Sequence, residues 1–198
     1  MEIVPNFFLL IVGAPRSGTS LMVDLMKVCG FDFGETIKPN KPWMGKRSPR
    51  NEHKLTTRGI VPKDFDFEKA FWRIERTKMN ATKIPHTFAI WVPEFVRRYD
   101  RLKIIVTQRD MNTLVSSNLE FDWTNRRRII EYTQDRIKDA QNLLDSDEYH
   151  TFPAPFEKVL SKDTEFLKCL LEYVEVQTPI EKLTCIIDPE VSRYTKLS

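Results

Sequence analysis

The sequence is poor in the residues that mark several specialised protein classes. It has three cysteines in 198 residues, Cys29, Cys169 and Cys185, which lie too far apart for a zinc site or a disulfide framework. We interpret them as reduced cysteines in the core. The apolar run from Phe7 to Val12 is too short to span a bilayer or form a signal core, and no basic segment precedes it. These features predict a cytoplasmic protein that has no membrane partner.

An excess of charge of one sign is also lacking. There are 31 Lys and Arg residues against 28 Asp and Glu residues, which gives a formal net charge of +3. This excess is too small to indicate a nucleic-acid partner. The three arginines from Arg126 to Arg128 are interpreted as a solvated helix face. With 41% hydrophobic residues, the chain is expected to form one globular domain over residues 1–198.

The apolar pattern predicts alternating strands and helices. Strands are expected at Phe7 to Val12, Leu102 to Thr107 and Leu183 to Ile187, with a weaker one around Tyr149 to Phe152. Helices are expected from Leu21 to Val28 with Gly30 as C-cap, and at Phe67 to Arg76, Phe88 to Tyr99, Leu114 to Phe121, Arg126 to Leu144 and Glu165 to Val174. This alternation predicts an α/β fold, a single domain whose central, mostly parallel β-sheet is flanked by helices.

One long segment, Asp32 to Asp64, breaks the alternation. It contains four prolines and little periodicity, and a segment of this length inside a small domain is usually functional or disordered. We interpret it as a mobile loop over the site, with plain disorder as the alternative. Its basic residues from Lys38 to Arg50, together with Trp43, either steer an anionic or sugar-bearing acceptor or belong to a solvated loop.

The turn after the first strand has the features of an anion site. It reads Gly-Ala-Pro-Arg-Ser-Gly-Thr-Ser from Gly13 to Ser20, between an apolar strand and a helical pattern. Such a turn brings backbone N–H groups and the positive end of a helix dipole to one point. Its glycines let the backbone close around an anion, and Arg16 adds a planar donor fork.

The glycine spacing is that of an ATP-binding P-loop, but Thr19 stands where that loop has its lysine. The acid after the second strand, Asp110, follows Arg109 and is a poor candidate for a magnesium ligand. Both features argue against phosphoryl transfer from magnesium-ATP. A small atypical P-loop kinase stays open as an alternative, as does a nucleotide-binding module without catalysis.

The hexapeptide Pro-Arg-Ser-Gly-Thr-Ser resembles the 5′-phosphosulfate-binding loop of sulfotransferases that use 3′-phosphoadenosine 5′-phosphosulfate (PAPS). The arginine in the loop is closer to the tyrosylprotein and bacterial-type branches of that family than to the cytosolic small-molecule branch. The resemblance implies transfer of a sulfuryl group from PAPS to a hydroxyl or amine acceptor, with no metal required. It assigns nucleotide binding to Gly13, Pro15, Arg16, Ser17, Gly18, Thr19 and Ser20.

Two further segments extend the resemblance. Arg109 ends the second predicted strand and Ser117 follows eight residues later, which is how the family holds the 3′-phosphate. An arginine at this position can donate two parallel hydrogen bonds to one phosphate group. Ser116 is the alternative to Ser117. Near the C-terminus, Glu157 and Leu160 match the segment that often follows the fourth strand of the family.

The resemblance also suggests catalytic residues. Arg16 is the first candidate for stabilising the leaving phosphate, and Lys83 is a second cation. Glu35 is the favoured general base because it matches the Gly-Glu of the tyrosylprotein branch. His86 and Glu52 are the other candidates for the base. The acceptor, a small molecule, carbohydrate or peptide, is not encoded in any motif, and neither is the oligomeric state.

Overall fold

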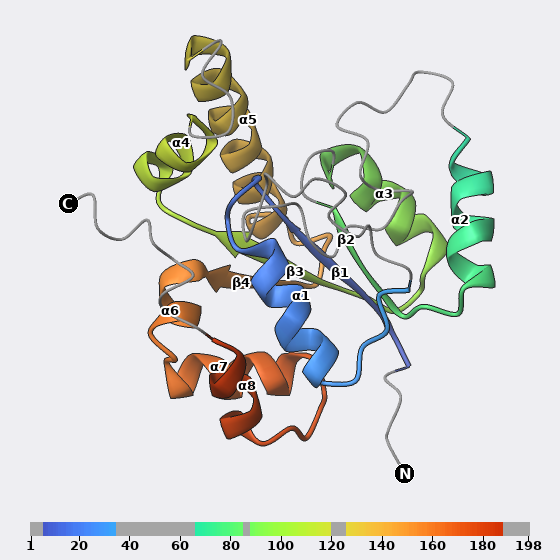
Figure 1. Cartoon of the computed structure of the whole chain (residues 1–198). Coiled ribbons are helices and arrows are strands. Elements are labelled where there is room, and N and C mark those ends of the chain that lie inside the picture. The colour runs from blue at the N-terminus through green and yellow to red at the C-terminus, as the bar shows by residue number, and fades with distance from the viewer. Residues whose placement is uncertain (1–5, 35–65, 85–87, 120–125, 188–198) are drawn as a thin grey trace, which may run out of the picture.

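The computed structural model describes residues 6–34, 66–84, 88–119 and 126–187, to which all structural statements refer (Figure 1). Four parallel strands form one sheet in the order β2-β1-β3-β4. The strands are β1 (Phe8–Gly13), β2 (Ala81–Ile84), β3 (Leu102–Gln108) and β4 (Thr151–Pro155). The predicted fold class, a single α/β domain with a central parallel sheet, is therefore confirmed.

Eight helices of the described residues pack around this sheet. They are α1 (Thr19–Val28), α2 (Phe67–Arg76), α3 (Phe88–Arg98), α4 (Met111–Leu119), α5 (Arg126–Leu144), α6 (Phe156–Leu160), α7 (Thr164–Tyr173) and α8 (Ile180–Ile186). Figure 1 shows α1 crossing in front of the strands, with α6, α7 and α8 beside it. Helices α2 and α3 lie at the β2 end of the molecule, and α4 and α5 lie at another end.

The central strand β1 is apolar throughout because both of its faces are covered. Leu9 and Ile11 point into one apolar cluster with residues of α1, α7 and α8. Leu10 and Val12 point into a second cluster with residues of α2, α3 and α5. Successive side chains of a strand face opposite sides, so a strand buried on both sides carries no polar alternation. This is the reason that the run was recognisable in the sequence.

The strand predicted at Leu183 to Ile187 is wrong. Most of this segment belongs to the helix α8, which begins after Pro179. Leu183 and Ile187 are buried in the first cluster and Ile180 packs against it, a spacing of three and four residues that fits one helix face. A five-residue segment with four apolar residues does not distinguish a strand from a buried helix, and the packing against α1 decides here.

The cysteine interpretation is correct only in part. All three cysteines are free thiols, but only Cys29 is buried, whereas Cys169 and Cys185 are exposed. Burial raises the pKa of the Cys29 thiol, despite an opposing hydrogen bond with Thr178. The two exposed cysteines lie on the outer sides of α7 and α8, because the inner sides of these helices carry leucine and phenylalanine.

The sheet order places the predicted loop at the centre of the molecule. β1 pairs with β2 on one side and with β3 on the other, and Gly13 is the register partner of Thr107. The sequence had not predicted β2, and β4 runs to Pro155, three residues beyond the expected end. Since all four strands are parallel, their carboxyl ends meet at one edge, where ligands of open α/β sheets usually bind.

Candidate functional site

The loop is attached to the neighbouring strand β3 by buried hydroxyl groups. Ser17 Oγ and Thr107 Oγ1 lie 2.6 Å apart, and Thr107 Oγ1 also donates to the carbonyl of Val12 at 3.1 Å. Gly13 makes this close approach possible: a Cβ atom there would lie 2.2 Å from Thr107 Oγ1. The first glycine of the loop is therefore required by packing against β3, in addition to any contact with a ligand.

The second glycine starts the helix that follows. Gly18 has a φ of 99°, in the left-handed region, and α1 begins at Thr19. The first-turn N–H groups of a helix have no acceptor within the helix, and the helix dipole adds positive potential at the same place. Thr19 is buried and Ser20 is half-buried, so two hydroxyl groups accompany these donors. This combination can hold a phosphate or sulfate group.

The arginine of the loop points toward α4. Arg16 has a φ of 74°, unusual for a residue with a side chain, and its Nε donates to Ser117 Oγ at 3.1 Å. Ser117 is buried, whereas its alternative Ser116 is exposed. The structure thus brings the predicted loop arginine to one of the two predicted serines, which lie 101 positions apart in the sequence.

A second arginine reaches the same place from the end of β3. Arg109 Nη1 donates to the backbone carbonyl of Arg16 at 3.2 Å. The Arg109 guanidinium carbon lies 4.3 Å from the centre of the Phe156 ring, within the range of a cation–π contact. Two guanidinium groups and a serine hydroxyl therefore converge on the β3 side of the loop, a donor set suited to a doubly charged phosphate.

A lysine lies on the opposite side of the loop. Lys83 is in β2, paired with Ile11 of β1, and its exposed fraction is only 2%. Its Nζ donates to Ser20 Oγ at 3.1 Å. Burying an ammonium group costs free energy unless it is paired, so a lysine buried beside the start of α1 has a role other than solubility. Lys83 is therefore not a solvated surface side chain.

The carboxylate that follows Arg109 acts as a helix cap. Asp110 accepts hydrogen bonds from the backbone N–H groups of Asn112 and Thr113, both at 2.9 Å, at the start of α4. The hydrogen bond from the Thr113 hydroxyl, with smaller contributions from these N–H groups and from Arg109, holds the pKa of Asp110 below its usual range. Both of its carboxylate oxygens accept hydrogen bonds from α4, a capping role that the sequence had not indicated.

Several predicted residues are not part of this assembly. Glu157 is exposed on α6, and Arg126 to Arg128 are exposed at the start of α5. The three candidate bases, Glu35, His86 and Glu52, lie outside the described residues, and so does the predicted mobile loop from residue 35 onward. The loop residues, Lys83, Arg109 and Ser117 are the predicted residues that the fold brings together.

Two residues of the assembly were missed in the sequence. Thr107 looks like an ordinary strand residue, and its pairing with Ser17 depends on the register between β1 and β3. Phe156 looks like a core aromatic, and its contact with Arg109 depends on the pairing of β3 with β4. No local signal marks either one, because both roles arise from contacts between strands that are distant in the sequence.

A cavity of about 70 Å³ lies behind the loop, between β3 and the helices α4 and α5. Nucleotide and drug pockets are usually several hundred Å³, so this space is too small for a nucleotide. Ser17, Thr107 and Arg109 are among its lining residues.

Two further properties follow from the described residues alone. They contain no group of three or more His, Cys, Asp or Glu side chains arranged to hold a metal ion. Among their helices, none combines the length and the apolar character needed to cross a membrane.

Comparison with solved structures identifies proteins of similar fold. A sulfotransferase domain from the olefin synthase of Synechococcus PCC 7002 matches with a TM-score of 0.59 and 13% identity, over 98% of this chain and 89% of that one. A sulfotransferase domain from the curacin biosynthetic pathway matches with a TM-score of 0.51 and 14% identity, over 93% and 78% of the two chains. The sulfotransferase STF9 from Mycobacterium avium matches with a TM-score of 0.59 and 12% identity, over 100% of this chain and 70% of that one.

The sequence comparisons gave no match, in contrast to the structural comparison. No family profile matches this chain, and no curated protein matches it. Identities of 12% to 14% establish similarity of fold and nothing finer. The chain therefore has the fold of sulfotransferase domains, a parallel α/β sheet with a strand–loop–helix unit at its carboxyl edge.

Proposed function

We propose that the chain transfers a sulfuryl group from PAPS to a hydroxyl or amine acceptor and releases adenosine 3′,5′-bisphosphate. The observation that carries the proposal is the hydrogen bond between Arg16 and Ser117. It joins the segment that resembles a 5′-phosphosulfate loop to the segment that resembles a 3′-phosphate site. The fold shared with sulfotransferase domains supports the same conclusion.

The donor set fits a nucleotide with anionic groups at both ends. On the β2 side, Lys83 and the hydroxyl of Ser20 accompany the start of α1. On the β3 side, Arg109 and Ser117 form a second donor group, and Arg16 of the loop contacts both of them. We assign the 5′-phosphosulfate to the loop with Lys83, and the 3′-phosphate to Arg109 and Ser117. ATP has no phosphate at its 3′ position and would leave the second group without an anion.

The chemistry of the reaction is displacement at sulfur. The acceptor oxygen or nitrogen forms a bond to sulfur while the bond between sulfur and the bridging phosphate oxygen breaks, and the acceptor proton passes to a base. Negative charge builds up on the leaving phosphate, where a buried cation is most effective. We propose Lys83 and Arg16 for that stabilisation, and Glu35, His86 or Glu52 for the base.

Calorimetry of the wild-type chain with adenosine 3′,5′-bisphosphate and with magnesium-ATP tests the proposal. A ligand at a hundred times its dissociation constant adds about 2.7 kcal/mol of stability, which a thermal-shift measurement also detects. We expect binding of the bisphosphate and not of magnesium-ATP. Binding of magnesium-ATP in its place would favour the kinase alternative and contradict the proposal.

Two arginine variants give this experiment a matched control. Arg109→Ala should strongly reduce the stabilisation by the bisphosphate, with residual binding through the loop and Lys83. Arg101→Ala removes the same side chain beside the opposite end of the same strand, where it lies 4.0 Å from Glu175 at the surface. It should leave binding unchanged. Transfer of labelled sulfate from PAPS to a panel of hydroxyl and amine compounds then distinguishes an enzyme from a binding module.

A further inference from the structure

Phe156 is an aromatic residue that contacts the site through Arg109. It is the first residue of α6 and follows Pro155, which pairs with Gln108 across the sheet. The residues that follow this pair are Phe156 and Arg109, so both leave the sheet at the same level. The guanidinium carbon of Arg109 lies 4.3 Å from the centre of the Phe156 ring.

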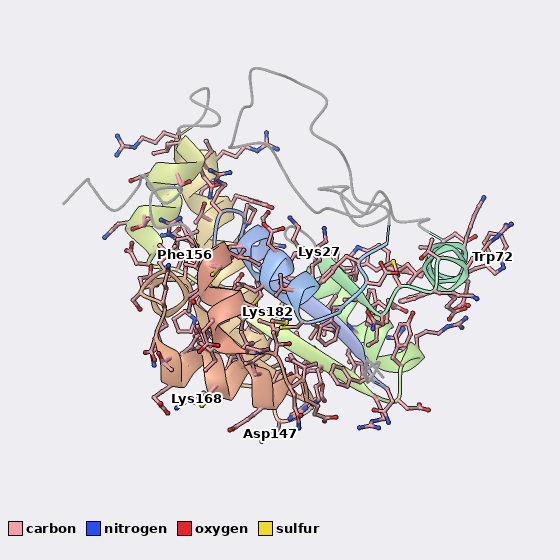
Figure 2. The ribbon with its side chains drawn as sticks, turned by 60° about the horizontal axis from the view of Figure 1, so that its bottom comes forward. Lys27, Trp72, Asp147, Phe156, Lys168 and Lys182 are labelled. Atoms are coloured by element: carbon pink, nitrogen blue, oxygen red, sulfur yellow. The ribbon has the colours of Figure 1, made fainter. Side chains whose placement is uncertain are left out.

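The same ring also contacts the loop. An added Cβ at Gly18 would lie 2.3 Å from Cδ2 and 2.9 Å from Cε2 of Phe156. The ring therefore occupies the space that a side chain at position 18 would need. Figure 2 shows Phe156 beside the end of α1 that follows the loop. Gly18 admits the ring, and the ring supports the guanidinium of Arg109.

An ordinary core role does not account for this position. Phe156 is half-buried and belongs to neither apolar cluster of the described residues. Phe152 on β4 and Leu160 on α6, by contrast, pack against the first cluster. The aromatic contact of Phe156 is with a cation of the site, which also donates to the backbone of Arg16.

We propose that Phe156 is a positioning residue that holds Arg109 in place for the 3′-phosphate of the nucleotide. This inference rests on the proposed function, because the 3′-phosphate is the group that Arg109 would bind. A guanidinium has several rotatable bonds before it, and each ordered long side chain costs conformational entropy on binding. Stacking on the Phe156 ring orders the Arg109 side chain before the nucleotide binds and so removes part of that entropy cost. The stacking should therefore increase affinity for nucleotides that carry a 3′-phosphate more than for those that lack it.

The experiment compares two nucleotides that differ only in that phosphate, adenosine 3′,5′-bisphosphate and adenosine 5′-phosphate. Their dissociation constants are measured by calorimetry for the wild type, Phe156→Leu, Phe156→Tyr, Arg109→Ala and the double variant Phe156→Leu/Arg109→Ala. Phe152→Leu is the control, since this ring belongs to the same strand–helix unit but packs on the core. Leucine keeps most of the apolar volume and lacks the π face.

We expect Phe156→Leu to weaken bisphosphate binding about ten-fold, as for loss of a partly desolvated cation–π contact, and 5′-phosphate binding less than about two-fold. Tyrosine should restore the preference for the bisphosphate. In the Arg109→Ala background the leucine substitution should have little further effect, because the two residues act as one unit. Phe152→Leu should leave the ratio of the two affinities unchanged.

Three results would overturn the assignment. One is an equal loss of affinity for both nucleotides in Phe156→Leu. Another is that Phe156→Leu weakens bisphosphate binding by the same factor in the wild type and in the Arg109→Ala background. The third is a wild type that binds neither nucleotide, which refutes the proposed function as well. A wild type that binds the bisphosphate tightly, with an unchanged affinity ratio in Phe156→Leu, refutes the role of Phe156 alone.

Discussion

Replacement of Gly18 by alanine should destabilise the protein more than replacement of any glycine in a similar conformation that lacks a neighbour. Gly18 has a φ of +99°, which residues with a side chain rarely adopt. The added Cβ would also lie 2.3 Å from Cδ2 of Phe156, closer than any normal contact. Two separate penalties therefore act on Gly18→Ala, one from the backbone and one from packing.

Gly30 provides the matched control because it carries only the first penalty. Its φ is +90°, and nothing lies within 4 Å of an added Cβ. The backbone penalty is about 1–2 kcal/mol for an L-residue in the left-handed region, and it applies to both variants. The packing penalty, about 1–3 kcal/mol for an overpacked site, applies to Gly18 alone. The free energy of unfolding should thus fall by about 1–3 kcal/mol more in Gly18→Ala than in Gly30→Ala.

Urea denaturation of the wild type and the two variants measures this difference. With a slope of about 2 kcal/mol per molar urea, the midpoint of Gly18→Ala should lie about 0.5–1.5 M below that of Gly30→Ala. Phe156→Leu in the Gly18→Ala background should recover part of the loss, since the shorter side chain relieves the contact. Equal midpoints for the two alanine variants would show that Phe156 does not pack against Gly18, and the reasoning would fail.

Three other perturbations have outcomes that the structure specifies. Lys83→Met should abolish the proposed sulfuryl transfer and lower the free energy of unfolding by about 1 kcal/mol, because it removes the hydrogen bond from Lys83 to Ser20. Asp110→Ala should reduce the free energy of unfolding by about 1 kcal/mol in denaturation experiments through loss of the α4 cap, and Asp110→Asn should retain most of it. Glu175 accepts a hydrogen bond from Lys103 at 2.6 Å, which lowers the pKa of that carboxyl. The stability that Glu175 contributes through this hydrogen bond is fully present above the unfolded pKa of a glutamate, about 4.3. It is lost as pH falls through the lower pKa of the folded state. Glu175→Gln should therefore lower the urea midpoint at neutral pH and leave it unchanged in strong acid; a constant difference at all pH values would contradict this.

The sequence predicts the part of the site that is local in the chain. The apolar strand, the glycine turn and the amphipathic helix from Phe8 to Val28 are continuous, so periodicity and turn residues suffice to recognise them. Arg109 and Ser117 were also predicted, because their spacing after the second predicted strand resembles the 3′-phosphate site of sulfotransferases. The pairing of Arg16 with Ser117 was not, since only the sheet order brings these segments together.

The errors have equally specific causes. The strand β2 has four residues and contains Lys83, so the apolar pattern that marks β1 is too short and is interrupted. The segment from Leu183 to Ile187 has the composition of a strand, but Pro179 and the packing of Leu183 on the first cluster produce a helix. In both cases tertiary contacts outweigh local propensity. The contact of Phe156 with Arg109 depends on a register that no pattern within either segment encodes.

The strand order explains why this site needs the whole sheet. β1 supplies the loop, β2 supplies Lys83 on one side, β3 supplies Arg109 on the other, and β4 leads directly to Phe156. A fragment with only β1, the loop and α1 keeps every residue of the glycine turn. It loses both flanking cations and the Thr107 hydroxyl that anchors Ser17. Because anion affinity at a helix start depends on such added charges, the loop sequence by itself should bind phosphate weakly. On the proposed function, selectivity for a nucleotide with phosphates at both ends is therefore expected of the assembled sheet and not of the loop alone.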